Sequence, residues 1–181
     1  MENTIWLTLI LFLPTVGAVL VALLPRENKQ LVRWAALAVS LVPLVLTLIL
    51  WVNFPHAAAD ADGYKFVEEY TWYAAINANY HVGVDGLSLT MVLLTTLLTP
   101  LAILASFSVE DRVNAFMALF LFLETGMLGV FLSLDLLVFF VFWEIGLVPM
   151  YFLINQWGSQ GGVRELWNGK TMEARSYASF K

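Results

Sequence analysis

The chain has 181 residues, of which 60% are apolar or aromatic and only 13% are charged. Soluble domains carry about a quarter charged residues, so this composition excludes an ordinary soluble globule and favours a membrane protein. The sequence has no cysteine, which excludes disulfides, cysteine-ligated iron–sulfur clusters and thiolate zinc sites.

Five segments are long and apolar enough to cross a bilayer. Each has about 20 residues, which matches a hydrocarbon core of about 30 Å. We therefore predict an all-α integral membrane protein that forms a single membrane domain over residues 1–181. The expected spans are about 4–24, 34–52, 87–108, 113–134 and 136–156, with a long loop at 53–86 and a tail at 157–181.

The lysines and arginines are distributed unequally between the two sides of these spans. Eight of the nine would lie on one side, and only Lys65 lies on the other. Because cytoplasmic loops carry the excess of positive charge, we expect the N-terminus and loop 53–86 outside and the tail in the cytoplasm. No basic residue precedes the first apolar segment, so we expect a retained span over residues 1–25 rather than a cleaved signal peptide.

The second half of the long loop alternates aromatic and polar residues. This pattern predicts a small β-hairpin with strands at Trp72–Ile76 and Tyr80–Val84 and a turn at Asn77, Ala78 and Asn79. We expect an ordered cap over the bundle rather than a binding site.

Two glutamates lie inside the predicted spans. Asp135 is the expected N-cap of the fifth helix. Glu124 precedes it by 11 residues and Glu144 follows it by nine. At about 1.5 Å per residue, both lie roughly 14–16 Å below the same surface, near the membrane midplane on adjacent antiparallel helices.

Intramembrane carboxylates are costly, so they are candidates for proton transfer. Pro149, five residues after Glu144, frees the carbonyl of Ile145 and favours a helix kink that would let water approach. In the alternative interpretation each glutamate is protonated and only bonds a neighbouring helix. The pattern favours proton transfer for Glu144, and both interpretations stay open for Glu124.

Three motifs make the sequence similar to a known family. The run from Asp135 to Ile154, which contains Trp-Glu-Ile-Gly-Leu-Val-Pro-Met, strongly resembles the fifth membrane helix of chain M of respiratory complex I. Chain M corresponds to mitochondrial subunit 4 and is one of the antiporter-like subunits of the proton-pumping NADH-quinone oxidoreductase. Residues 84–89 and 122–126 resemble the family's third and fourth helices. Family members are much longer, so the chain resembles an N-terminal fragment of a larger antiporter-like bundle.

The resemblance implies a role for the chain and for its glutamates. Glu144 would be essential for proton pumping, paired in the family with a lysine on a later helix, and Glu124 would be accessory. No cofactor is expected on this chain, because flavin, iron–sulfur clusters and quinone belong to partner subunits. The expected partners are the lipid bilayer and other membrane subunits, among them the antiporter-like chains L and N, in a bacterial inner membrane or an equivalent energy-transducing membrane. The alternatives are a subunit of a cation/proton antiporter or membrane-bound hydrogenase, and a structural membrane scaffold.

Overall fold

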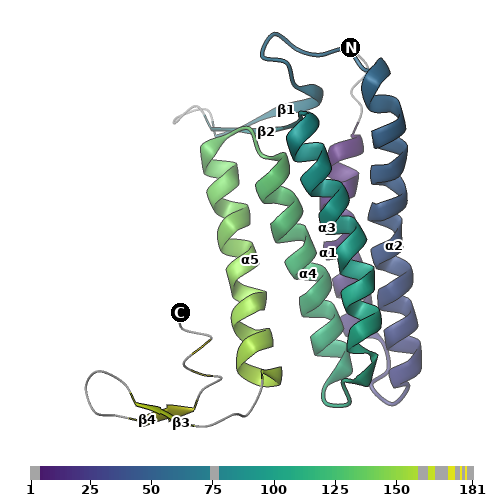
Figure 1. Cartoon of the computed structure of the whole chain (residues 1–181), viewed down its shortest axis with the longest axis vertical. Helices are drawn as coiled ribbons and strands as arrows, with labels where there is room; N and C mark the ends of the chain where they lie inside the picture. Colours follow the sequence, from purple (N-terminus) through teal and green to yellow (C-terminus); the bar gives the residue numbers. More distant parts are fainter. Residues whose placement is uncertain are drawn as a thin grey trace.

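The computed structural model describes residues 5–73, 78–158, 163–165 and 171–173, together with residues 176 and 178. Five long helices lie alongside one another, and a β-hairpin crosses one end of the bundle (Figure 1). The helices are α1 (Trp6–Leu23), α2 (Lys29–Asn53), α3 (Gly86–Ala105), α4 (Val113–Leu132) and α5 (Leu136–Trp157), with short 3₁₀ segments η1 (Phe54–His56) and η3 (Ser106–Ser108). The hairpin strands are β1 (Lys65–Tyr73) and β2 (Ala78–Val84), and a second pair is β3 (Val163–Glu165) with β4 (Thr171–Glu173).

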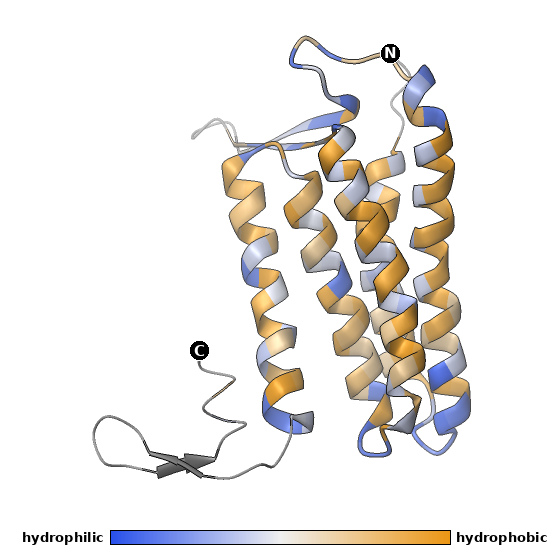
Figure 2. Ribbon diagram, in the orientation of Figure 1, coloured by the Kyte–Doolittle hydropathy of each residue, from blue (hydrophilic) through white to orange (hydrophobic). Residues whose placement is uncertain are grey.

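All five long helices have the length and apolar composition needed to cross a membrane. Apolar residues predominate along each helix, and hydrophilic residues lie mainly at the helix ends and on the hairpin, except for hydrophilic segments midway along α4 and α5 (Figure 2). The predicted fold, a mostly helical membrane protein with five spans, is confirmed for the described part of the chain. The direction in which these helices cross the membrane stays a prediction.

Helix α4 lies at the centre of the bundle and α5 at its edge. Half of the apolar stretch of α4 is buried, because α4 packs against each of the other four helices. Only 22% of the apolar stretch of α5 is buried, and its main helical neighbour is α4. One face of α5 is therefore uncovered by the described residues.

Short polar side chains determine where three of the helices begin. Asp135 accepts hydrogen bonds from the backbone N–H groups of Leu137 and Val138 at 2.8 and 3.2 Å, which confirms it as the N-cap of α5. Asp85 and Ser88 form a reciprocal capping box at the start of α3. Asn28 caps α2, so this helix begins at Lys29, before the expected span.

The predicted hairpin exists, but its predicted bounds are wrong. Strand β1 begins at Lys65 and pairs antiparallel with β2, so that Tyr70 lies opposite Tyr80. Ala78 and Asn79, expected in the turn, belong to β2. The rest of the predicted first strand and turn, residues 74–77, lies outside the described residues. Strand β2 packs against α1, α3, α4 and α5, and these tertiary contacts extend the pairing beyond the stretch that alternates in sequence.

The side chain of Glu68 anchors the hairpin to the start of α1. Glu68 is only 4% exposed, and its carboxylate accepts hydrogen bonds from the backbone N–H groups of Leu7 (2.8 Å) and Thr8 (3.2 Å). The Thr8 hydroxyl also donates to Glu68 and lies 2.9 Å from the Tyr80 hydroxyl. A helix N-terminus leaves N–H groups without intrahelical partners, so this carboxylate serves as a cap from a distant segment.

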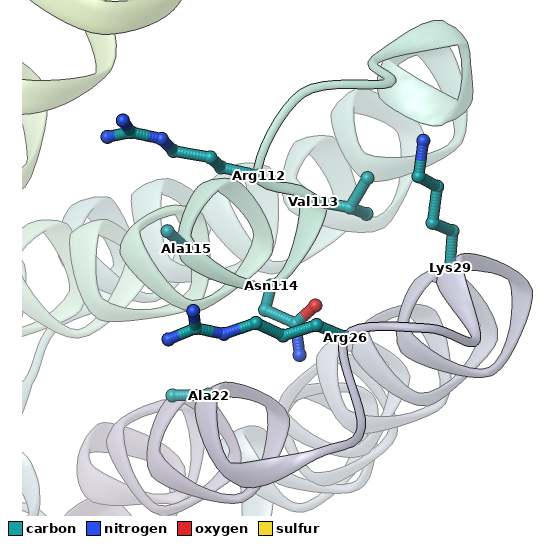
Figure 3. A pocket seen from close by; sticks show the side chains of 7 residues that line it. All are labelled: Ala22, Arg26, Lys29, Arg112, Val113, Asn114 and Ala115. Atoms are coloured by element: carbon teal, nitrogen blue, oxygen red, sulfur yellow. The ribbon is translucent and has the colours of Figure 1, made fainter.

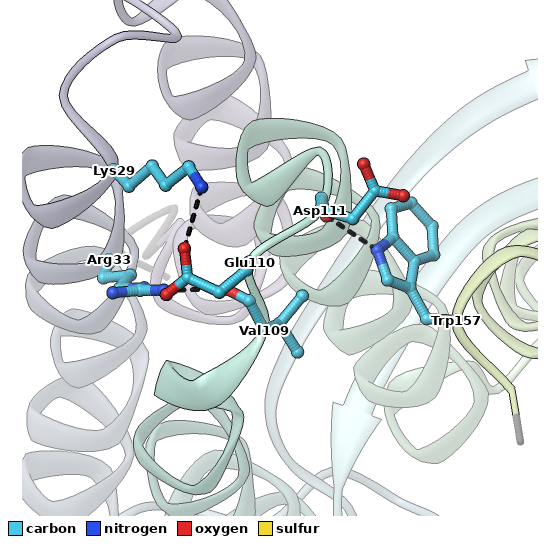
Figure 4. Close-up of polar contacts among 6 residues, drawn as sticks. All are labelled: Lys29, Arg33, Val109, Glu110, Asp111 and Trp157. Carbon is cyan, nitrogen blue, oxygen red and sulfur yellow. Dashed lines mark hydrogen bonds and ion pairs between the residues drawn. The ribbon is translucent and has the colours of Figure 1, made fainter.

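At the opposite end of the bundle, the turn between α3 and α4 is tied to two other helices (Figure 4). Arg33 of α2 donates to the Val109 carbonyl at 2.7 Å and to Glu110 at 2.9 Å, and Lys29 also pairs with Glu110 at 2.8 Å. The indole N–H of Trp157, at the end of α5, donates to the Asp111 carbonyl at 2.8 Å. Hydrogen bonds from Lys29, then Arg33, lower the pKa of Glu110.

Candidate functional site

Helices α4 and α5 approach each other closely at a pair of glycines. A Cβ atom on Gly126 would lie 2.7 Å from both the N and the Cα of Gly146. One turn further along α4, the Phe142 ring fills the space beside Gly129. Small residues permit such close backbone contact between membrane helices.

The two glutamates lie on either side of this contact rather than within it. Glu124 precedes Gly126 by two residues, and Glu144 precedes Gly146 by two residues. Two residues correspond to about 200° of rotation on an α-helix, so each glutamate points away from the neighbouring helix. The helices are antiparallel, so the glutamates are also offset by about 6 Å along the axes.

Glu124 points into the interior of the bundle. It has 0% exposure, and neither carboxylate oxygen has a hydrogen-bond partner among the described residues. Thr99 of α3 is the neighbouring polar side chain, but its hydroxyl donates at 3.0 Å to the Thr95 carbonyl. A buried carboxyl group without partners is rare in folded proteins and calls for a functional or structural explanation.

A group of buried hydroxyl side chains, not singled out from the sequence, lies in the helices around Glu124. Thr95, Thr96 and Thr99 form one buried face of α3, and Thr125 of α4 accepts a 2.8 Å hydrogen bond from Thr15 of α1. The buried Thr47 hydroxyl of α2 also lacks a partner among the described residues. The spacing of the three α3 threonines along one helix face was the only signal of this polar interior in the sequence.

Glu144 lies on the uncovered side of α5. It is exposed in the described structure, as are Trp143, Leu147 and Val148 around it. Pro149 is buried, and α5 continues through it as one helix. The five described helices therefore bring Glu124 into a protein interior and leave Glu144 without one.

The sequence and structure comparisons identify the family. The family model for the amino terminus of NADH-ubiquinone oxidoreductase chain 4 matches residues 7–135. The chain belongs to this family. Members of the chain 4 family include the NAD(P)H-quinone oxidoreductase chain 4 1 of Nostoc sp., which is 40% identical over 153 residues, 84% of this chain and 28% of the relative. The NADH-ubiquinone oxidoreductase chain 4 of Marchantia polymorpha is 37% identical over 152 residues, 83% of this chain and 30% of the relative.

Solved structures show the same fold. A chain of respiratory complex I from Thermus thermophilus with bound NADH superposes with a TM-score of 0.73 at 26% identity, covering 96% of this chain and 31% of that one. A chain of the membrane-bound sulfane sulfur reductase, an archaeal respiratory membrane complex, matches in fold alone, with a TM-score of 0.68 at 22% identity. The chain spans under a third of the length of the chain 4 relatives that it matches.

Proposed function

We propose that this chain forms part of a proton-translocating membrane subunit of an NADH-quinone oxidoreductase complex. In this proposal Glu144 carries protons and Glu124 is accessory. The observation that supports it most is Glu124, a fully buried carboxyl group in the central helix of a chain 4 family member, with no hydrogen-bond partner among the described residues. Burial of such a group costs free energy that a merely structural bundle would avoid with an apolar residue.

The position of Glu144 suggests how the site is completed. An exposed carboxylate facing lipid from the middle of an apolar helix is unfavourable. In the proposal, further membrane helices of the full-length subunit cover this face of α5 and supply a proton partner for Glu144. Pro149 leaves the Ile145 carbonyl without an intrahelical donor, so a water molecule between them can extend the proton path.

The redox chemistry belongs to other subunits in this proposal. Flavin, iron–sulfur clusters and quinone reside there, and the antiporter-like chains L and N are the expected membrane partners. The N-terminus would lie outside and the tail inside, in a bacterial inner membrane or an equivalent energy-transducing membrane. Relatives from a cyanobacterium and from the chloroplast of Mesostigma viride support an energy-transducing membrane in the broader sense, which includes membranes other than the bacterial inner membrane.

The test is the variant Glu144→Gln in the complete complex. Glutamine preserves shape and most hydrogen bonding but has no titratable proton, so assembly should persist while proton pumping in membrane vesicles fails. Glu144→Asp should retain part of the pumping. Glu27→Gln, the same change in the exposed α1–α2 turn, is the control and should pump normally. Normal pumping by a fully assembled Glu144→Gln complex would instead support the structural-scaffold alternative.

A further inference from the structure

A basic pocket lies where α1 ends and α4 begins. It has a volume of about 650 Å³ and is lined by Ala22, Arg26, Lys29, Arg112, Val113, Asn114 and Ala115. Asn114 closes its inner wall by donating to the carbonyls of Val21 and Leu24 at 3.3 and 2.8 Å. The pocket therefore joins a helix C-terminus to a helix N-terminus at one end of the membrane-spanning bundle.

Two of the three cations in this pocket are available to a ligand. Lys29 is paired with Glu110. Neither Arg26 nor Arg112 forms an ion pair with any described residue, and both are exposed. In Figure 3 the two arginine side chains extend toward the side of Ala22 and Ala115, whereas Lys29 lies apart from them at the other side of the view. Arg112 also makes a long hydrogen bond, 3.4 Å, to Gln156 of α5.

An apolar groove continues from this pocket along the same helices. It has a volume of about 470 Å³ and shares Ala22 and Ala115 with the basic pocket. Alanines make the groove because their side chains leave space between α1 and α4. Its other lining residues are Thr15, Ala18, Val19, Ala118, Leu119, Phe122, Phe152 and Gln156. From Ala22 to Thr15 the groove extends about 10 Å toward the membrane midplane.

We propose that the pocket and groove together bind one anionic phospholipid. Its phosphate lies between Arg26 and Arg112, and one acyl chain lies in the groove between α1, α4 and α5. Arginine binds phosphate oxygens with a planar array of donors, and residues at the ends of membrane helices lie at headgroup depth. Charge at one end and a continuous apolar wall beyond it match the two parts of a phospholipid, whereas a free phosphate would use only the first.

Photo-crosslinking of the full-length protein, purified with the subunits that accompany it, tests this proposal. A benzophenone amino acid replaces Val19, which lines the groove and is 55% exposed. Val16, 59% exposed on the same helix but outside the groove, is the control position. The protein is placed in vesicles that contain phosphatidylglycerol and phosphatidylcholine, and the captured lipid is identified by mass spectrometry. We expect position 19 to capture phosphatidylglycerol in excess of its share in the vesicle, and position 16 to capture both lipids according to their shares.

Variants separate the headgroup site from the groove. Arg26→Gln and Arg112→Gln should each lower phosphatidylglycerol capture about fivefold, because each removes one cation near the headgroup. Lys65→Gln, at the other end of the bundle, should not. Ala118→Leu should fill the groove and lower capture, whereas Ala38→Leu, on the exposed face of α2, should leave it unchanged.

Three results would overturn the proposal. The first is capture of the two lipids at position 19 in their vesicle proportions. The second is capture that does not respond to the two arginine variants in protein whose assembly is normal. The third is crosslinking from position 19 to a protein segment, which would mean that a later helix or another subunit fills the groove.

Discussion

Glu124 and Glu144 lie on opposite sides of the contact between α4 and α5. Glu124 faces the bundle interior with no exposed surface, and Glu144 faces outward from α5. The cause is the pairing of Gly126 with Gly146, which lies about half a helical turn from each glutamate. If both residues take part in proton transfer, the connection between them must therefore pass around α4 or α5 through water or other side chains.

The first prediction concerns the contact between Gly126 and Gly146, where an added methyl group has less space at Gly126 than at Gly146. Gly126→Ala would place a methyl group 2.7 Å from the Gly146 backbone, so the two helices must separate. We expect a loss of about 1–3 kcal/mol in stability, seen as less assembled complex and a lower temperature of thermal inactivation. Gly146→Ala places its methyl group 3.9 Å from the nearest Gly126 atom, an ordinary contact, and should be tolerated.

Gly86→Ala controls for the effect of any glycine replacement in a helix, since no atom lies within 4 Å of its added methyl group. Equal losses of assembly for Gly126→Ala and Gly146→Ala would show that α4 and α5 do not pack in the described way.

The second prediction concerns Glu124. Glu124→Gln keeps the side-chain volume, so the complex should assemble, and pumping should fall less than in Glu144→Gln. Glu124→Ala leaves a cavity in the bundle centre, and we expect it to cost about 2–4 kcal/mol, visible as reduced assembly. A Glu124→Gln complex that assembles but loses all pumping would contradict the accessory role.

The third prediction concerns Glu68, outside the membrane spans. Burial raises the pKa of Glu68 above 4.5, although hydrogen bonds from Thr8 and Leu7 oppose this effect. The folded state then binds the Glu68 proton more tightly than the unfolded state does. This contribution is fully present below pH 4.5 and is lost as the pH rises through the folded-state pKa.

Two Glu68 variants and the protease sensitivity of loop 53–86 test this assignment. Glu68→Gln should remove the pH dependence while still accepting a hydrogen bond from α1. Glu68→Ala leaves the N–H groups of Leu7 and Thr8 without their acceptor, and we expect it to cost about 1–3 kcal/mol at every pH. Glu68→Ala protein with a loop as resistant as the wild type would show that this carboxylate does not anchor the hairpin.

The fourth prediction is the orientation in the membrane. The chain has no cysteine, so single cysteines can be introduced without background in this subunit. Asp62→Cys and Gln30→Cys occupy exposed positions at opposite ends of the bundle. An impermeant reagent added from outside should label position 62 and not position 30. The reverse labelling pattern would require the opposite orientation.

Much of the fold follows from local sequence signals. The five apolar segments predicted five membrane helices, and Asp135 predicted the start of α5, because hydrophobic length and helix capping are properties of short segments. The hairpin bounds were less accurate. The pairing of Lys65–Tyr73 with Ala78–Val84 depends on how β2 rests on four helices as well as on alternation within the strands.

The sequence by itself determined that two carboxyl groups lie deep in apolar helices, since depth needs only a count of residues from a helix end. Only the tertiary structure decided which way each one faces. Rotation about a helix axis depends on which residues of two helices touch, here Gly126 and Gly146, and residues separated by some twenty positions along the chain carry no local record of that choice. The same holds for Glu68, which caps α1 from 61 residues away because folding brings the hairpin over the helix end.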